Sequence, residues 1–429
     1  MRHLSVESLT AVQVRRRFLL LYGLRWMPVG ILIPSLVLLL VEREISIGAI
    51  GFALSLRGFV WLFLDIPAGG LADTWGRRPV LLTAAAITLA SFVILATVET
   101  LAGLMIFSIL QALYRALDSG TLHAWYVDAT LALGAKDSLE RGFRHAGSIL
   151  GYGIAAGCLL SGLLVYTHPI PGVAALNQPV VAGALINVIA LLCFWLLVPE
   201  TKSATGYLPF LSAVRTVPAT VRQGLRLVFT KRVLLMLTAV ELLWGFGMAA
   251  YETLIPLRIE DVTSVADAAA LLSPVTAAGW FVSSLGAAAL PLLTRRLGQV
   301  GTAVLLRVVQ GVVVVGMGLA AGPIGVIAGY LACYVLHGAA APLHQTMLHD
   351  SIEGPHRTTA SSVNSTANQL SNAIGLVVLT QVVEGFSAAS AFLVAGVALA
   401  AAAPFYLSLR RVPAAGKPAD RVTTAPPAD

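Results

Sequence analysis

Charged residues are scarce in this sequence. Asp, Glu, Lys and Arg make up only 11% of its 429 residues, whereas soluble domains average about 25%. Hydrophobic residues make up 57% of the chain, and the mean hydropathy is +0.84. So little polar surface cannot cover a water-soluble fold of this size, and the composition therefore predicts a membrane protein.

Cysteine is also rare, because only Cys158, Cys193 and Cys333 occur, all within apolar runs. No Cys-x-x-Cys pair is present, so we expect no disulfide framework and no metal site. The sequence contains no Gly-x-Ser-x-Gly, His-Glu-x-x-His or phosphate-binding loop. We therefore expect neither a cofactor nor enzymatic activity. The first apolar run begins near Phe18 and is too long for a signal peptide, so we expect a permanent first span.

The apolar residues come in repeated blocks of about 20, the length that an α-helix needs to cross a bilayer. The blocks are continuously apolar and do not alternate, which favours helices over a barrel. The fold class that we predict is an all-α integral membrane protein with twelve transmembrane helices. The predicted spans are about 18–41, 47–68, 80–98, 101–126, 144–167, 178–198, 233–256, 272–293, 301–321, 323–346, 359–383 and 386–408.

The distribution of Lys and Arg predicts the orientation. Of the 28 basic residues, 22 fall in the loops and tails of one side, and only Arg43 and Arg258 fall in the loops of the other side. The positive-inside rule predicts that both termini lie in the cytoplasm. We expect the protein to span the inner (cytoplasmic) membrane of the cell. The formal charge of +7 is explained by this asymmetry, so we expect the lipid bilayer and no nucleic acid as a partner.

The longest loop divides the spans six and six. We predict an N-terminal six-helix bundle at 1–198, a cytoplasmic linker at 199–232, a C-terminal bundle at 233–409 and a disordered cytoplasmic tail at 410–429. In the linker, Arg215, Arg222 and Arg226 share one helical face, which predicts an amphipathic helix on the membrane surface; a solvated linker is the alternative. Weak similarity at an offset of 222 residues suggests two like-oriented halves.

A compact motif lies between the second and third spans. Gly-x-x-x-Asp-x-x-Gly-Arg-Arg is formed by Gly69, Asp73, Gly76, Arg77 and Arg78. This loop resembles the signature loop of the major facilitator superfamily, as do the span number and the central linker. The resemblance implies two pseudo-symmetric six-helix bundles and a gate that locks the outward-facing state. It places Asp73 against the start of span eleven and pairs Arg77 with Asp128.

The resemblance has departures. Thr74 stands where the family usually has a basic residue, and a second copy at Arg295, Arg296 and Gly298 lacks the acid. Span five is rich in glycine but lacks the Gly-Pro step of the family's proton antiporters. The alternative for the motif is a basic loop that fixes orientation and has no gating role.

Ionisable residues within spans are functional candidates because burying them is costly. The coupling and substrate candidates are Arg25, Arg57, Asp65, Arg115, Asp118, Glu241 and Glu252. Glu241 is the first candidate proton carrier because it lies deepest, and Glu252 shares its helix face but falls near the outer interface. Arg115 resembles the family's arginine linked to proton coupling, and pairing with Asp118 three residues later is the alternative. Asp65 belongs with either the substrate site or the gate.

Other polar residues within spans receive simpler interpretations. Arg307 falls near the inner end of span nine, where snorkelling is a sufficient explanation. His337 and His344 lie on one face of span ten, and pore or packing roles are favoured over a metal site.

The sequence therefore predicts a monomeric secondary active transporter, with protons and a small-molecule substrate as partners. Apolar span walls and the resemblance to twelve-span drug/proton antiporters favour proton-coupled efflux of hydrophobic or amphipathic molecules. The alternatives are proton-coupled uptake of an organic solute and a non-transporting sensor or scaffold with a transporter fold.

Overall fold

A computed structural model describes residues 8–118, 120–199, 222, 226–351 and 357–411. Within these ranges every regular element is a helix. The N-terminal half contains α1 (Ala11–Glu42), α2 (Ile47–Trp75), α3 (Arg77–Thr97), α4 (Leu101–Asp118), α5 (Thr121–Ala132), α6 (Ser138–Thr167), η2 (Ala175–Asn177) and α7 (Gln178–Leu197). The C-terminal half contains α9 (Arg232–Ala249), η3 (Ala250–Leu254), α10 (Ile255–Glu260), α11 (Val265–Leu319), α12 (Pro323–Asp350), α13 (Arg357–Gly385), α14 (Ala388–Ala401), α15 (Ala403–Leu407) and η5 (Ser408–Arg411).

Helix boundaries follow local chemistry. Thr10 forms a capping box with Gln13 at the start of α1, and serine side chains cap α2, α11 and α14. Such caps satisfy backbone N–H groups that have no partner within the helix. The helices α2 and α3 meet at Gly76, whose φ of 91° lies in the left-handed region that a glycine adopts without strain.

The described helices agree with the twelve predicted spans. Nine of them are long and apolar enough to cross a bilayer. Among these, α11 has 55 residues, about 80 Å at 1.5 Å per residue, and it bends sharply at Gly298 (φ 70°). It therefore supplies two spans. The remaining two spans are α2, whose apolar part is Ile47–Trp61, and the more polar α13.

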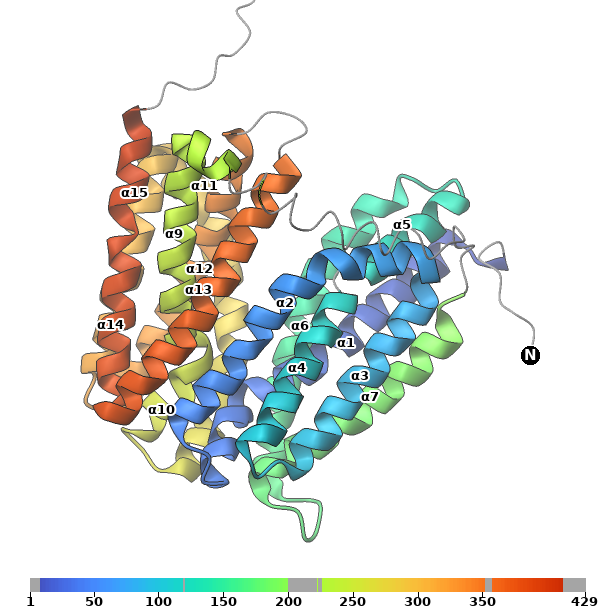
Figure 1. Ribbon diagram of the computed structural model, residues 1–429, viewed down its shortest axis with the longest axis horizontal. Helices are drawn as coiled ribbons and strands as arrows, with labels where there is room; N and C mark the ends of the chain where they lie inside the picture. The colour runs from blue at the N-terminus through green and yellow to red at the C-terminus, as the bar shows by residue number, and fades with distance from the viewer. Residues whose placement is uncertain (1–7, 119, 200–221, 223–225, 352–356, 412–429) are drawn as a thin grey trace, which may run out of the picture.

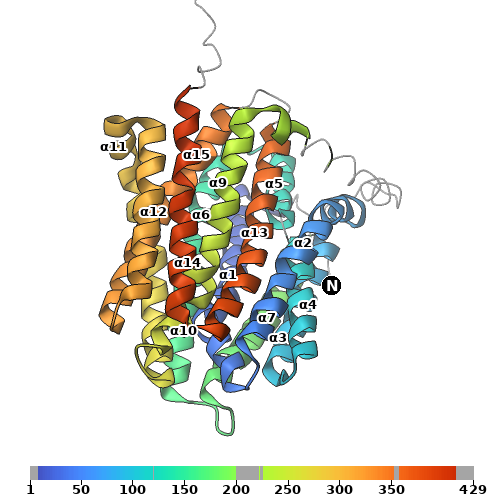
Figure 2. The same ribbon diagram turned by 60° about the vertical axis from the view of Figure 1, so that its left-hand side comes forward.

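The two sets of helices lie side by side as two bundles (Figures 1 and 2). Within the first bundle α1 packs on α6 and α3 on α4, and within the second α11 packs on α12 and α9 on α13. The bundles meet where α2 packs on α13 and where α6 packs on α11. The domain boundaries within 199–232 lie largely outside the described residues, as do the predicted amphipathic helix and the tail.

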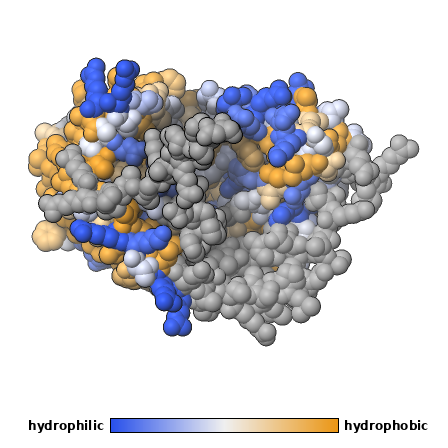
Figure 3. All heavy atoms as spheres, turned by 90° about the horizontal axis from the view of Figure 1, so that it is seen from above, coloured by the Kyte–Doolittle hydropathy of each residue, from blue (hydrophilic) through white to orange (hydrophobic). Residues whose placement is uncertain are grey.

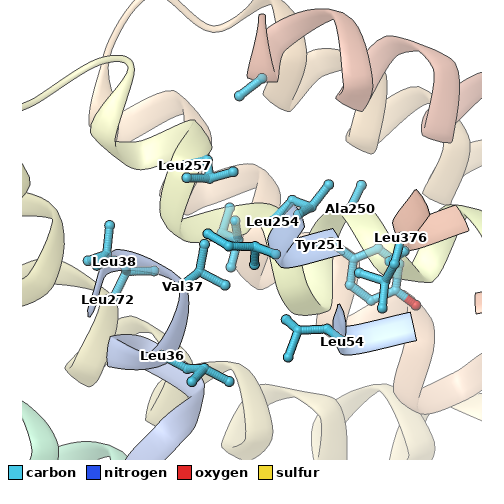
Figure 4. Packing of buried hydrophobic residues seen from close by; sticks show 14 of the residues in the cluster. Leu36, Val37, Leu38, Leu54, Ala250, Tyr251, Leu254, Leu257, Leu272 and Leu376 are labelled. Atoms are coloured by element: carbon cyan, nitrogen blue, oxygen red, sulfur yellow. The ribbon is translucent and has the colours of Figure 1, made fainter. Parts of the chain in front are cut away.

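A hydrophobic cluster joins the bundles at one end of the molecule. Leu36, Val37 and Leu38 of α1 meet Leu254 of η3 and Leu272 of α11 (Figure 4). Leu54 of α2 and Leu376 of α13 extend the same cluster. Away from this end, α2 diverges from α13 in both ribbon views (Figures 1 and 2). Seen from above, the opposite end carries hydrophilic side chains on both bundles (Figure 3).

Three glycines of the predicted glycine-rich span, Gly153, Gly157 and Gly162, lie close to another helix, and Gly157 makes the tightest of these contacts. A Cβ added at Gly157 of α6 would lie 2.2 Å from the Met27 carbonyl oxygen of α1. By contrast, Gly147 and Gly151 have open space around the same position. The close approach of α1 and α6 therefore depends on Gly157, and Gly147 and Gly151 have no such packing role.

Two arginines cap equivalent helices in the two bundles. Arg43 donates hydrogen bonds to the carbonyl oxygens of Leu95, Ala96 and Val98 at the end of α3. Arg258 donates to the carbonyl oxygens of Met317, Gly318 and Ala320 at the end of α11. Each acceptor in the second set lies 222 residues after its counterpart. The two basic residues on the sparsely charged side are thus explained by capping of exposed carbonyls.

Candidate functional site

A cavity of about 270 Å³ lies between the two bundles, close to the lower end of the range for small-molecule sites. Each contributing helix presents residues spaced by three or four positions, which is one helical face. The lining comprises Arg25, Trp26 and Val29 of α1; Leu54, Ser55, Arg57, Gly58 and Trp61 of α2; Gln111, Tyr114, Arg115 and Asp118 of α4; Met248, Glu252 and Thr253; and Gln369, Asn372, Ala373 and Leu376 of α13. Five of the seven candidate coupling residues therefore meet in one place.

Asp118 pairs with Arg25 across the interface of α4 and α1. The side chains are only 3% and 13% exposed, and Tyr114 interacts with both. The alternative that Asp118 neutralises Arg115 on its own helix is wrong, because the carboxylate contacts another helix. The i,i+3 spacing places the two residues on one face, but sequence spacing carries no information about a competing arginine on α1.

Arg57, Arg115 and Glu252 form a second charged group in the cavity. The guanidinium of Arg115 lies 5.9 Å from the Trp61 ring centroid and interacts electrostatically with Glu252 and with Arg57. Glu252 therefore belongs to the cavity lining, and its place near the outer interface stays a prediction. Glu252 falls within the π-helical turn η3, and such turns occur frequently at functional sites.

Glu241 lies outside the cavity, in a buried polar network of the C-terminal bundle. It is 4% exposed. Its Oε2 accepts a hydrogen bond of 2.7 Å from Asn368, and its Oε1 accepts one of 3.4 Å from Asn364. The same Oε1 lies 3.2 Å from His344 Nε2. Both Glu241 and Glu252 therefore lie beside α13, but in two separate environments.

His344 extends this network to the last helix. Its Nδ1 lies 2.6 Å from the Tyr406 hydroxyl, and its Nε2 lies 2.7 Å from Asn364 Nδ2. Because an amide nitrogen only donates, Asn364 makes His344 Nε2 an acceptor, so a proton between Glu241 Oε1 and His344 Nε2 resides on the carboxyl, which donates to the imidazole. Glu241 can thus hold one proton without rearrangement of the heavy atoms.

Arg307 lies in the same network and is fully buried, at 0% exposed. Its Nη1 donates to Gln310 Oε1 at 2.6 Å, and its guanidinium lies 3.6 Å from the Trp244 ring centroid. Among the described residues, its Nε and Nη2 have no hydrogen-bond partner. Snorkelling to the membrane surface was therefore the wrong explanation, because the side chain points into the bundle towards Glu241, with which it interacts electrostatically.

His337 joins an aromatic cluster near this network. Its Nδ1 lies 3.1 Å from the Tyr251 hydroxyl, which accepts a hydrogen bond of 3.3 Å from Trp244 Nε1. Within the described part of the chain, no group of three His, Cys, Asp or Glu side chains is placed to hold a metal ion. The histidines thus act within hydrogen-bonded chains in this structure.

The motif between spans two and three is helical up to Trp75, which corrects the expectation of a loop. Gly76 alone breaks the helix. Arg77 Nε donates to Asp128 Oδ2 at 3.3 Å, and the side chains are 20% and 46% exposed. Arg78 Nη2 donates to the Trp195 carbonyl oxygen at 2.7 Å. The side chains at Asp65, Gly69 and Asp73 lie outside the described residues.

The C-terminal bundle contains a counterpart of this pair. Gln299 Nε2 donates to Asp350 Oδ2 at 3.4 Å, and both residues lie 222 positions after Arg77 and Asp128. The preceding Gly298 has φ 70° and ψ 169°, similar to φ 91° and ψ 158° at Gly76. The second copy therefore keeps the geometry. A neutral glutamine takes the place of the arginine, so the hydrogen bond to the carboxylate is weaker.

Sequence reasoning missed most partners of Glu241. Asn364, Asn368 and Tyr406 were not candidates, although polar residues recurring every four positions in an apolar span are a usable signal. The low mean hydropathy of α13 follows from such residues. Their partners could not be predicted, because they lie on helices far away in the sequence.

Comparisons with known proteins agree with this architecture. A family profile described as the Major Facilitator Superfamily matches residues 18–343. The tetracycline resistance protein, class G, of Vibrio anguillarum is 31% identical over 191 residues, which are 44% of this chain and 46% of that protein. The match therefore spans just under half the length of that relative.

Solved transporter structures share the fold at low sequence identity. The nucleoside transporter NupG has a TM-score of 0.76 at 13% identity, with 93% of this chain and 100% of that chain covered. The peptide transporter POT in complex with sulfate has a TM-score of 0.69 at 15% identity, with coverage of 94% and 98%.

Proposed function

Because the chain belongs to the Major Facilitator Superfamily, we propose that it is a secondary active transporter that exports amphipathic small molecules in exchange for protons. The observation that carries this proposal is the cavity between the bundles, which combines aromatic walls with an ion pair and further charged groups. Transporters of parallel-repeat design bind their substrates at such an interface and rock the halves around it. We take residues 1–198 and 233–409 as the two moving halves of a monomer.

The present arrangement fits an inward-facing state. Basic loops favour a cytoplasmic position for the end with the Arg77–Asp128 pair. The hydrophobic cluster of Figure 4 includes Leu95 and Val98, which lie at the opposite end of α3 from Arg77. With this orientation, both termini are cytoplasmic and the protein lies in the inner membrane. The cavity would then be closed from outside by apolar side chains.

The motif residues Gly69, Asp73, Gly76, Arg77 and Arg78, together with Asp128, are proposed as the gate. In the outward-facing state, α2 would approach the start of α13, and Asp73 would contact it there. The observed Arg77–Asp128 pair ties α3 to α5, so it would keep the motif rigid while the halves move.

Proton coupling is assigned to Glu241 with His344. The pair is buried, Glu241 can hold a proton that it donates to His344, and the carboxyl interacts with a desolvated arginine. A change of charge at Glu241 would alter its attraction to Arg307 and hence the interaction between α9 and α11. Asp118 and Glu252 are secondary candidates because they face the cavity, where the substrate can compete with a proton for the neighbouring arginines.

The direction of transport is inferred from the comparison with a resistance protein. A relative that confers resistance to an antibiotic supports export, because a membrane transporter protects a cell by removing the compound. The structural neighbours include nucleoside and peptide transporters, which keeps uptake by proton symport as the second candidate. A non-transporting sensor is the third.

The test uses purified protein in vesicles that contain a pH-sensitive dye. A panel of amphipathic compounds is added, and substrate-dependent proton movement is recorded against protein-free vesicles. We expect proton movement that requires both the protein and the compound. No proton movement over a broad panel would contradict the proposal and favour the sensor. Susceptibility of an exporter-deleted host with and without the protein then distinguishes export from uptake.

A further inference from the structure

The central cavity carries more positive than negative charge on its described lining. Its ionisable side chains are three arginines and two carboxylates. Arg25 and Asp118 neutralise each other in an ion pair, and Arg115 interacts with Glu252. Arg57 makes no ion pair among the described residues. From the charge of Arg57 we infer that the cavity binds amphipathic molecules with an anionic head, a carboxylate in particular, and that Arg57 is the residue that contacts it. The inference rests on the proposed function and specifies its substrate class.

Arg57 is the residue whose surroundings require a partner. Its Nε donates a hydrogen bond of 3.4 Å to the Leu54 carbonyl oxygen of its own helix. The like charge of Arg115 acts on Arg57. Burying a guanidinium costs free energy unless an anion compensates its charge. We infer that the substrate supplies this anion.

The cavity also suits the shape of a carboxylate. A guanidinium presents paired N–H groups that match the two oxygens of a carboxylate, and such bidentate pairs are stronger and more specific than single hydrogen bonds. Gln111 of α4 and Gln369 and Asn372 of α13 add neutral amide donors on neighbouring walls. The N–H groups of these amides can donate hydrogen bonds to an anion, and they add no further charge to the site.

The rest of the cavity selects an apolar body. Trp26 and Trp61 lie on different helices, and each already has an arginine close to its ring, Arg25 at 5.2 Å and Arg115 at 5.9 Å. Leu54, Val29 and Leu376 add to the apolar part of the lining. An aromatic or aliphatic ring against these walls would hold the head group near Arg57. A cationic head would instead meet the guanidinium of Arg57 and be repelled.

Three naphthalene compounds test the inference because they share one apolar body: naphthaleneacetic acid, naphthaleneacetamide and naphthylethylamine. Near neutral pH they are an anion, a neutral molecule and a cation. Binding to purified protein in detergent is measured by isothermal titration calorimetry. We expect the anion to bind roughly tenfold tighter than the amide, since hydrogen bonds to charged groups exceed neutral ones, and the amine to bind least.

Substitutions at Arg57 assign the effect. Arg57→Gln should lower the affinity for the anion roughly tenfold and leave that for the amide within about twofold. Arg57→Lys keeps the charge without the paired donors, so its affinity for the anion should be intermediate. It also provides a folded variant if Arg57→Gln is unstable. Arg296→Gln, at an exposed arginine outside the cavity, is the matched control and should change nothing.

Several results would overturn the inference: equal or tighter binding of the amide or amine, no binding of any of the three, or an unchanged anion preference in Arg57→Gln. Transport measurements in vesicles distinguish a wrong substrate class from a wrong proposed function. Coupled transport of neutral or cationic compounds without anion preference overturns only the substrate class. Anion binding that depends on Arg57 upholds the substrate class, even if no compound moves protons.

Discussion

Removing one partner of the Arg25–Asp118 pair should destabilise the protein strongly. The two side chains are 13% and 3% exposed, so Asp118→Asn leaves a buried arginine without its counter-charge. Breaking such a buried pair typically costs about 3–5 kcal/mol. Asparagine has almost the same volume as aspartate, so packing is retained and the loss reports the charge. The free energy of unfolding is measured by titration with SDS in mixed micelles, followed by circular dichroism.

Two comparisons make this prediction specific. The double variant Arg25→Gln with Asp118→Asn removes both charges and should recover most of the loss, because neither charge remains unpaired. Asp128→Asn breaks a pair whose carboxylate is 46% exposed, and exposed pairs contribute about 0–1 kcal/mol. Equal losses for Asp118→Asn and Asp128→Asn would refute the reasoning, as would a double variant no more stable than Asp118→Asn.

Three further predictions concern other parts of the fold. Gly157→Ala should destabilise by about 1–3 kcal/mol by separating α1 from α6, whereas Gly151→Ala, with open space around it, should be neutral or slightly stabilising in the same SDS titration. Arg43→Met removes the hydrogen bonds that cap α3 and should cost about 1–3 kcal/mol; an unchanged unfolding midpoint would contradict the capping role. Arg77→Gln should shift the inward–outward population without changing substrate preference, measured by labelling a cysteine introduced at Ser55 from each side of the membrane; unaltered labelling on both sides would contradict a gating role.

The spans could be predicted from the sequence because membrane helices are continuous apolar blocks. The limits of the helices could not, since breaks depend on single backbone conformations. Gly76 ends a helix that otherwise runs through the motif, and composition alone does not distinguish a helical motif from a loop. The helices α4 and α5 are divided near Gly120, which has φ 74°, although the apolar pattern continues through it.

The site was predictable as a set of residues and not as an arrangement. Buried charge in an apolar span identifies a functional candidate, and Arg25, Arg57, Arg115, Asp118 and Glu252 do meet in one cavity. Which charges pair depends on how helices cross. Asp118 therefore has its partner on α1 and not three residues away on its own helix.

Arg307 illustrates the same limit. Its place near the end of a span is compatible with snorkelling, and only the packing of α9, α11 and α12 shows that its side chain is fully buried. Positions 222 residues apart are more alike in structure than their weak sequence similarity indicates. Equivalent positions at Arg77 and Gln299, and at Asp128 and Asp350, make equivalent contacts.

Gradient-driven accumulation tests the central claim of proton-coupled transport most directly. A pH difference of one unit corresponds to about 1.4 kcal/mol, or a tenfold concentration ratio for one-to-one exchange. In vesicles with this gradient, we predict about tenfold accumulation of a transported compound by the wild-type protein. Glu241→Gln should carry the same compound downhill but accumulate none, because its amide cannot release a proton. Full accumulation by Glu241→Gln would contradict the assignment of the proton to Glu241, and wild-type transport that ignores the gradient would contradict proton coupling itself.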